Sequence, residues 1–199
     1  IPIARGKVAK EIIWSKWNNF SRVIVYNLKE EEWSSPFGQS KYYNGYIPKQ
    51  WGVLVDDTGY TVASEFPDNE GKLDFFRWNI ISLPYLINNG SSLIIGPGGG
   101  KDVLCAIAMG VKKEDITAVE LNPLVVQAVN DVLGSETNSL YNQVNTYVSE
   151  GRSFLEKRRG EKKYDVIQAT SVYGRIPPAA GIFTFAEDNL YTKEAFRTY

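Results

Sequence analysis

The residues best suited to chemistry are a glycine-rich turn and two acids, each of which follows an apolar segment of the chain. The turn is Gly96-Pro97-Gly98-Gly99-Gly100, directly after residues 93–95. Glu120 ends the next apolar segment, and Glu150 with Gly151 follows the third. A tight turn before a helix lets the backbone approach a ligand and points free helical amides at it. An acid about 20 residues further on can accept hydrogen bonds from both hydroxyls of a ribose. The sequence therefore predicts a nucleoside-bearing ligand.

Each signal also has a purely structural interpretation. Lys101 stands where the dinucleotide fingerprint needs its third glycine, and Asp102 stands where the P-loop needs Ser or Thr. The turn can therefore be a glycine-rich turn without a ligand, and Glu120 a solvated acid at a strand end. Glu150 can accept a hydrogen bond from an adenine amine or favour the dipole at a helix N-terminus. The separation between the turn and Glu120 is what favours a nucleoside.

The composition excludes several classes of protein. The 199 residues include no histidine, which excludes Ser-His-Asp and Cys-His nucleophile pairs, a histidine base and a His-ligated zinc. A single cysteine, Cys105, excludes an internal disulfide and a cluster of thiolate metal ligands. We therefore expect no bound metal, and we expect the protein to be located in a reducing compartment, the cytoplasm. A net charge of -1 argues against a nucleic-acid partner, and we interpret the basic run at 157–163 as a solvated connection. No apolar run is long enough to span a bilayer.

The elements that must position these residues alternate between strands and helices. After a polar turn cluster at 88–92, strands are predicted at 93–95, 116–121, 144–148 and 164–169, and helices at 102–109, 123–133 and 152–158. Strict alternation predicts an α/β, Rossmann-like, mostly parallel sheet with helices on both faces. Ligands bind such a sheet outside the carboxyl ends of its strands, where the turn, Glu120 and Glu150 fall.

The first part of the chain has a different pattern. Short β-rich runs at 21–26 and 51–55, separated by turn residues, predict a small antiparallel β unit. Residues 72–87 carry apolar side chains at helical spacing and predict one amphipathic helix; these side chains are Leu73, Phe76, Ile80, Leu83 and Ile87. We therefore expect an N-terminal unit at 1–71 and a nucleoside-binding domain at 72–199. The aromatic-rich segment 33–51 is expected to pack in the core or a subunit contact, or to close over a pocket.

Residues 93–199 resemble the spermidine/spermine synthase (aminopropyltransferase) family, which has the class I methyltransferase-like fold. The matching segments are IGPGGG (95–100), VELNP (119–123), EGRSFL (150–155), YDVI (164–167) and NLYTKEAF (189–196). In addition, KWNNFSRV (16–23) is similar to the opening of synthase-like domains attached to bacterial multi-helix membrane proteins. The resemblance implies a cytoplasmic module whose parent chain is attached to a membrane region through segments absent here.

The resemblance also implies a ligand and a role for each predicted site residue. The ligand, a co-substrate, would be S-adenosylmethionine or decarboxylated S-adenosylmethionine. Gly96, Gly98 and Gly100 would approach its methionyl part, Glu120 its ribose, and Glu150 with Gly151 its adenine. The class I fold continues with further strands after residues 191–199. We therefore expect a fold truncated at its C-terminus, whose exposed sheet edge needs covering, by self-association for example.

Some family residues are missing. The family follows its fourth strand with an acidic Asp-Ser-Ser-Asp segment, whereas this chain has Thr170 and Tyr173 at the acidic positions. Gly99 replaces an aspartate, which Asp102 lies close enough to substitute, and residues 76–78 (Phe-Arg-Trp) replace a Tyr-His-Glu group. A cationic amine must lose a proton before it attacks, so the missing carboxylates remove both its anchor and its base.

Three functional hypotheses follow. A sulfonium ligand carries its own leaving group, so a transferase acting on an unidentified acceptor needs mainly positioning and exclusion of water. Asp102 and Tyr173 are its candidate acceptor contacts, although Tyr173 can equally be a loop aromatic that caps the sheet. The alternative is a non-catalytic nucleoside-sensing or assembly module that has lost the polyamine site. A dinucleotide oxidoreductase is a third hypothesis, which Lys101 weakens.

Overall fold

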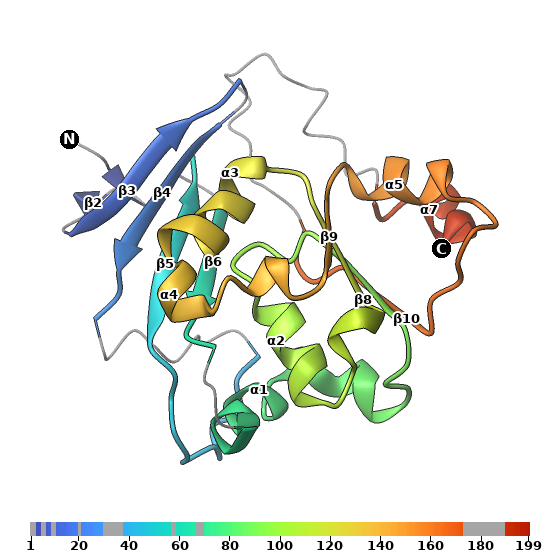
Figure 1. The fold of residues 1–199 in the computed structure, drawn as a ribbon, viewed down its shortest axis with the longest axis horizontal. Helices are drawn as coiled ribbons and strands as arrows, with labels where there is room; N and C mark the ends of the chain where they lie inside the picture. The colour runs from blue at the N-terminus through green and yellow to red at the C-terminus, as the bar shows by residue number, and fades with distance from the viewer. Residues whose placement is uncertain are drawn as a thin grey trace.

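Two four-stranded sheets, one antiparallel and one parallel, organise the chain (Figure 1). The structure is a computed structural model that describes residues 3–4, 7–8, 11–19, 21–29, 38–56, 59–66, 70–172 and 190–199. A separate short pair, β1 (Ile3–Ala4) and β2 (Lys7–Val8), precedes both sheets. Among the described residues, no helix combines the length and the apolar character needed to cross a membrane.

The antiparallel sheet is a meander in chain order. Its strands are β3 (Ile12–Trp17), β4 (Arg22–Asn27), β5 (Gln50–Val55) and β6 (Gly59–Ser64). The central strands β4 and β5 carry fully buried valines, which explains why the sequence pattern marked them as strands. This sheet confirms the predicted N-terminal antiparallel unit and adds β3 and β6, which the pattern did not mark.

The parallel sheet has the order β10-β7-β8-β9. Its strands are β7 (Ser92–Ile95), β8 (Ile116–Glu120), β9 (Asn145–Val148) and β10 (Val166–Gln168), and all neighbours pair in parallel. From β7 the chain adds strands first on one side and then, with β10, on the other. A reversal of this kind opens a crevice at the carboxyl ends of the strands beside the reversal.

Helices pack on both faces of the parallel sheet. One face, which includes Ile94 and Ala118, packs against α2 (Lys101–Ala108) and α3 (Pro123–Gln127). The other face, which includes Leu93 and Val119, packs against α5 (Gly151–Lys157). Helix α7 (Lys193–Thr198) contacts α5, on the right of Figure 1. This arrangement confirms the predicted Rossmann-like fold, in which alternate residues of each strand face opposite layers.

The remaining helical segments are short connections. The chain continues from α3 as a π-helical stretch, η5 (Ala128–Val132), and then forms α4 (Gly134–Thr137) and η6 (Leu140–Asn142) before β9. Between α2 and β8 lies η4 (Lys113–Asp115). Buried residues of both sheets belong to one continuous cluster, including Val25 and Val53 from the first and Ile94 from the second. The division into 1–71 and 72–199 stays a prediction.

The single amphipathic helix predicted over 72–87 is wrong. The chain instead forms η2 (Glu70–Leu73), α1 (Asp74–Arg77) and η3 (Ile80–Leu86). Asn79 interrupts the helix because its backbone is extended and its side chain accepts a hydrogen bond from the Ile81 amide at 3.0 Å. The predicted apolar face is therefore split into buried Leu73 and Phe76, and exposed Ile80, Leu83 and Ile87.

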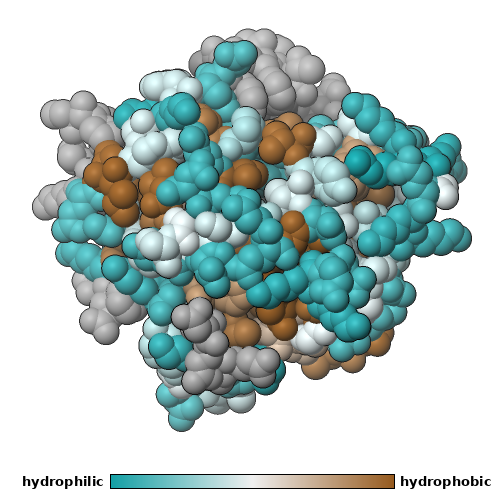
Figure 2. Space-filling model, in the orientation of Figure 1, coloured by the Kyte–Doolittle hydropathy of each residue, from teal (hydrophilic) through white to brown (hydrophobic). Residues whose placement is uncertain are grey.

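Helix η3 carries an apolar strip on its outer side. A 3₁₀-helix repeats every three residues, so Ile80, Leu83 and Leu86 lie in one line. Their exposed fractions are 63%, 56% and 71%. Figure 2 shows hydrophobic side chains at the lower right edge of the molecule, where η3 lies in Figure 1. We call these three residues the apolar strip.

Candidate functional site

The predicted glycine turn joins β7 to α2 at the carboxyl edge of the parallel sheet. Gly96, Gly98 and Gly100 have φ angles of 63°, 55° and 93°, a region that glycine adopts without steric cost. At Gly98 a side chain would also meet a neighbour, because a Cβ there would lie 2.7 Å from Thr61 Oγ1. The predicted tight turn is thus present, and it is packed closely against β6.

Glu120 reaches this turn from the end of β8. Its Oε2 accepts a hydrogen bond from the Gly98 amide at 3.1 Å, and its Oε1 accepts one from the Asn122 amide at 2.9 Å. The side chain is 7% exposed. Burial raises the pKa of Glu120, although the amides of Asn122 and Gly98 act in the opposite direction. The two sequence signals, 22 residues apart, therefore meet directly.

The backbone amides of the turn are all used within the protein. The Gly96 amide donates to Val119 O at 2.8 Å, and the Gly98 amide donates to Glu120 Oε2 at 3.1 Å. The Gly99 amide donates to Thr61 Oγ1 at 2.9 Å, and the Gly100 amide donates to Pro97 O at 2.9 Å. These four turn amides are therefore already hydrogen-bonded within the protein. Because phosphate binding relies on unpaired backbone N–H donors, these four amides do not form a phosphate cradle as folded. Ligand contacts by Gly96, Gly98 and Gly100 stay predictions.

The antiparallel sheet covers the turn through β6. Ala63 forms an isolated bridge with Gly100, and the Thr61 hydroxyl accepts from the Gly99 amide. A Cβ at Gly99 would lie only 2.2 Å from Val62 O. The aspartate that the resembling family carries at position 99 therefore has no room here unless β6 moves. Steric exclusion by β6 gives a physical reason for this departure from the family pattern.

Tyr141 on η6 contacts the turn as well. Its hydroxyl donates to Gly98 O at 2.6 Å, and the residue is 2% exposed. Burial, followed by the charges of Glu120 and Asp102, raises the pKa of Tyr141 well above its ordinary value, so the phenol stays a proton donor. Sequence reasoning missed Tyr141 because a tyrosine in a polar connection carries no periodic or motif signal.

Asp102 belongs to a buried polar cluster where β10 ends. It lies in the first turn of α2, and its Oδ1 accepts from Gln168 Nε2 at 3.2 Å. The same nitrogen lies 3.0 Å from Thr170 Oγ1, and the Tyr85 hydroxyl donates to Gln168 Oε1 at 2.6 Å. Burial raises the pKa of Asp102 to about 6, partly offset by a hydrogen bond from Thr170 and by the charge of Lys101. Asp102 therefore sits beside Thr170, where the resembling family carries an acid.

Glu150 and Gly151 lie where the chain enters α5. Glu150 caps this helix: Oε1 accepts from the Arg152 amide at 2.9 Å and Oε2 from the Ser153 amide at 2.7 Å. Burial raises the pKa of Glu150, but these amides outweigh it and leave the pKa below its ordinary value. Gly151 packs on Ile95, whose Cγ2 would lie 2.4 Å from a Cβ at this position. Glu150 therefore lies at the N-terminus of a helix, as one of its two sequence interpretations had it. Contact of Glu150 and Gly151 with an adenine stays a prediction. Tyr173 lies outside the described residues.

Two exposed apolar side chains flank Glu120, and sequence reasoning missed both. Leu121 follows Glu120 directly and is 45% exposed. Val148, which pairs with Glu120 in the register of β8 and β9, is 54% exposed. Apolar surface beside a few well-placed polar groups is typical of small-molecule sites. The signal that could have found these residues is their position at the carboxyl ends of two strands.

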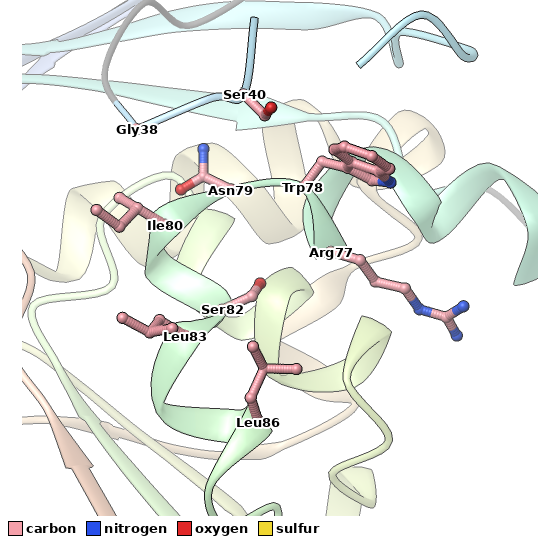
Figure 3. A pocket seen from close by; sticks show the side chains of 9 residues that line it. All are labelled: Gly38, Ser40, Arg77, Trp78, Asn79, Ile80, Ser82, Leu83 and Leu86. Atoms are coloured by element: carbon pink, nitrogen blue, oxygen red, sulfur yellow. The ribbon is translucent and has the colours of Figure 1, made fainter. Parts of the chain in front are cut away.

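A separate cavity of about 400 Å³ opens between residues 38–40 and η3 (Figure 3). Its lining is Gly38, Ser40, Arg77, Trp78, Asn79, Ser82 and the apolar strip. In Figure 3 Ser40 lies across from Leu83 and Leu86, while the Arg77 side chain extends to one side; its Nε donates to Ala108 O at 2.6 Å. Neither the glycine turn nor Glu120 lines this cavity, so it is distinct from the candidate nucleoside site.

Comparisons with known proteins show similarity at the level of the fold. No family model matches the sequence, and a search of curated proteins finds no match. The chain is similar to spermidine synthase from Thermotoga maritima, with 15% identity and a TM-score of 0.57 over 94% of this chain and 52% of that one. It is also similar to a spermidine synthase in complex with the transition state analogue AdoDATO, with 14% identity and a TM-score of 0.54 over 94% and 51% of the two chains. The chain thus spans about half the length of these structures and has a spermidine synthase-like fold.

Proposed function

We propose that this chain binds S-adenosylmethionine or decarboxylated S-adenosylmethionine and transfers an alkyl group, aminopropyl or methyl, to an acceptor. The observation that carries the proposal is the hydrogen bond between the Gly98 amide and the Glu120 carboxylate, at the carboxyl edge of a parallel sheet. Exposed Leu121 and Val148 beside Glu120 offer apolar surface for the nucleobase of the ligand. The likeness to a synthase solved with AdoDATO supports the same ligand class.

The charges around the turn favour a cationic ligand over a phosphate. The amides of the turn's glycines are engaged, while the charges of Glu120 and Asp102 both act on Tyr141 beside the turn and raise its pKa. Burial lowers the pKa of the neighbouring Lys101, although the charges of Cys105 and Asp102 act in the opposite direction. A sulfonium suits this environment, whereas the pyrophosphate of a dinucleotide does not. The oxidoreductase hypothesis therefore has the least support.

In the proposed reaction Glu120 accepts hydrogen bonds from the ribose hydroxyls and fixes the ligand. The lone pair of the acceptor forms a bond to the carbon on the sulfonium. The carbon–sulfur bond breaks, and its electron pair leaves on sulfur as a neutral thioether. An amine acceptor must also lose a proton, and Asp102 is the carboxylate we propose for this step, because a pKa of about 6 lets it accept a proton near neutral pH.

The second candidate is a non-catalytic nucleoside-sensing or assembly module. Thr170 at an acidic position of the family supports loss of the amine site. The apolar strip, which lines a cavity away from the turn, supports contact with a protein partner. This candidate keeps the nucleoside site and discards the transfer step, so turnover separates it from the first.

Calorimetry with S-adenosylmethionine, its decarboxylated form and methylthioadenosine tests the ligand. We expect binding of at least one of them, weakened about ten-fold or more in Glu120→Gln, because a buried hydrogen bond to a charged group is lost. The exposed Glu114 supplies the matched control, Glu114→Gln, which keeps wild-type affinity. Absence of binding by all three ligands would overturn the proposal. Product formation with putrescine, spermidine or another amine would eliminate the sensing module.

A further inference from the structure

Three side chains close a ring of hydrogen bonds between the two sheets. Asn18 Nδ2 donates to Asn122 Oδ1 at 2.9 Å, Asn122 Nδ2 donates to Ser21 Oγ at 2.8 Å, and the Ser21 hydroxyl donates to Asn18 Oδ1 at 3.2 Å. Asn18 and Ser21 lie in the connection from β3 to β4, whereas Asn122 follows β8. Each donor in the ring meets an acceptor. We call this arrangement the asparagine ring.

The orientation of both amide groups in the ring is determined by neighbouring backbone. Asn122 Oδ1 also accepts from the Leu124 amide at 3.1 Å, as the N-cap of α3, and Asn18 Oδ1 accepts from the Ser21 amide at 2.9 Å. Turning either side-chain amide round would place an NH₂ group against a backbone N–H. Asn122 and Ser21 are 5% and 4% exposed, so water does not readily replace these bonds. The ring therefore has one consistent arrangement.

The asparagine ring ends at the candidate nucleoside site. The backbone amide of Asn122 donates to Glu120 Oε1 at 2.9 Å, and the other carboxylate oxygen accepts from Gly98. The ring and the cap hold the Asn122 backbone in an extended conformation, with φ −98° and ψ 108°. A continuous path of hydrogen bonds thus runs from the antiparallel sheet through Asn122 and Glu120 to the glycine turn.

We propose that Asn18 is a positioning residue that acts through Asn122 on Glu120, so that docking of the antiparallel sheet sets the affinity of the nucleoside site. The inference rests on the proposed function, in which Glu120 holds the ribose. A carboxylate binds two hydroxyls well only when both of its oxygens point at them and the group is ionised. A backbone amide that donates to a carboxylate oxygen orients that oxygen and stabilises the ionised form. Opening the ring frees the Asn122 amide to move away from Oε1.

A purely structural role for the ring is the competing explanation, and Lys16 provides the matched control. Lys16 Nζ donates to Gln127 Oε1 at 3.1 Å. This bond joins β3 to α3 but involves no side chain of the asparagine ring. If the ring only held the two sheets together, variants at Asn18 and at Lys16 would both change the stability of the protein and leave the ionisation of Glu120 as it is in the wild type. A positioning role predicts that the ring variants also change the ionisation of Glu120.

The first measurement needs no ligand. The variants Asn18→Ala and Ser21→Ala open the ring from two sides, and Lys16→Met is the control. Carboxyl ¹³C NMR titration follows Glu120, assigned by loss of its signal in Glu120→Gln. We expect its pKa to rise by about half a unit or more in both ring variants, because a hydrogen bond to the charged form weakens. Lys16→Met should titrate as the wild type does.

The titration must separate Glu120 from the ionisable groups near it. Tyr141, whose pKa is raised by burial and by the charges of Glu120 and Asp102, stays protonated throughout the range. Asp102 itself titrates near pH 6, so the series is repeated in Asp102→Asn. Ser21→Ala is the smaller change and keeps the test decisive if Asn18→Ala destabilises the fold.

The second measurement is the affinity for methylthioadenosine by calorimetry. We expect about five-fold weaker binding in Asn18→Ala and in Ser21→Ala, and no further loss in the double variant, because both changes open the same ring. Unchanged Glu120 titration in the ring variants overturns the positioning role, whatever the ligand does. If the wild type fails to bind methylthioadenosine and both forms of S-adenosylmethionine, the proposed function fails, while the titration still decides what the ring does.

Discussion

The amide of Gly98 donates to the carboxylate of Glu120 across 3.1 Å and joins the glycine turn to the neighbouring strand. Gly98 has a left-handed conformation, at φ 55°, and lies close to Thr61. The turn is therefore held by three parts of the chain at once: β6 through Thr61, β8 through Glu120 and η6 through Tyr141.

Replacement of Gly98 by alanine should be costly. A Cβ there would be held at φ 55° and would lie 2.7 Å from Thr61 Oγ1, so strain and overlap add. We expect a loss of about 2 kcal/mol or more in the free energy of unfolding, measured by urea denaturation. Gly160→Ala is the control, because Gly160 has φ 86° and no heavy atom within 4 Å of an added Cβ. Equal losses in the two variants would show that packing against Thr61 contributes nothing.

The buried carboxyl of Asp102 should make stability depend on pH. Its pKa rises from 3.8 to about 6 on folding, so the folded state binds more protons between these values. Stability therefore falls as pH rises from about 4 to about 6 and stays lower above that range. Asp102→Asn should remove this pH dependence. In urea denaturation, its free energy of unfolding at pH 8 should exceed that of the wild type by up to roughly 3 kcal/mol, whereas the two should agree at pH 3.5.

Asp131 on η5 supplies the control for that experiment because it is exposed. Asp131→Asn should change stability by less than about 0.5 kcal/mol at both pH values. A wild type that is more stable than Asp102→Asn at pH 8 would contradict the burial argument. If Asp102 also accepts the proton from an amine acceptor, turnover should fall as pH drops through about 6 and should be lost in Asp102→Asn.

Loss of the Tyr141 hydroxyl should remove the hydrogen bond that it donates to Gly98 O. We expect Tyr141→Phe to lower the free energy of unfolding by about 1 kcal/mol and to weaken nucleoside binding a few-fold, since the turn loses one of its three supports. Tyr191→Phe removes a similar bond, to Ala169 O at 2.8 Å, from an exposed residue. Calorimetry should therefore give wild-type affinity for Tyr191→Phe, and equal affinities in the two variants would exclude a role for Tyr141.

The apolar strip should be separable from the nucleoside site. Leu83 lines the cavity beside η3, which the glycine turn does not line, so Leu83→Glu should keep nucleoside affinity within about two-fold of the wild type. If the strip mediates self-association, sedimentation should show dissociation of the same variant. A large loss of nucleoside affinity in Leu83→Glu would contradict the separation of the two sites.

Part of this protein could be read from the sequence alone. The alternation of strand and helix after residue 92 correctly predicted the Rossmann-like sheet, because the period of buried side chains differs between strands and helices. The glycine turn and the position of Glu120 were found because such residues at strand ends are local features. The helix over 72–87 was not predicted correctly, since the capping bond of Asn79 and the 3₁₀ winding of η3 outweighed apolar spacing.

The tertiary structure decided how the turn's polar groups are used. The amides of Gly98 and Gly99 donate to Glu120 and Thr61, because β8 and β6 bring those oxygens within hydrogen-bond distance. The asparagine ring likewise joins residues more than 100 positions apart. Sequence determines which side chains can bond, but hydrogen bonds need partners within about 3 Å, and only packing of distant segments selects among the available partners.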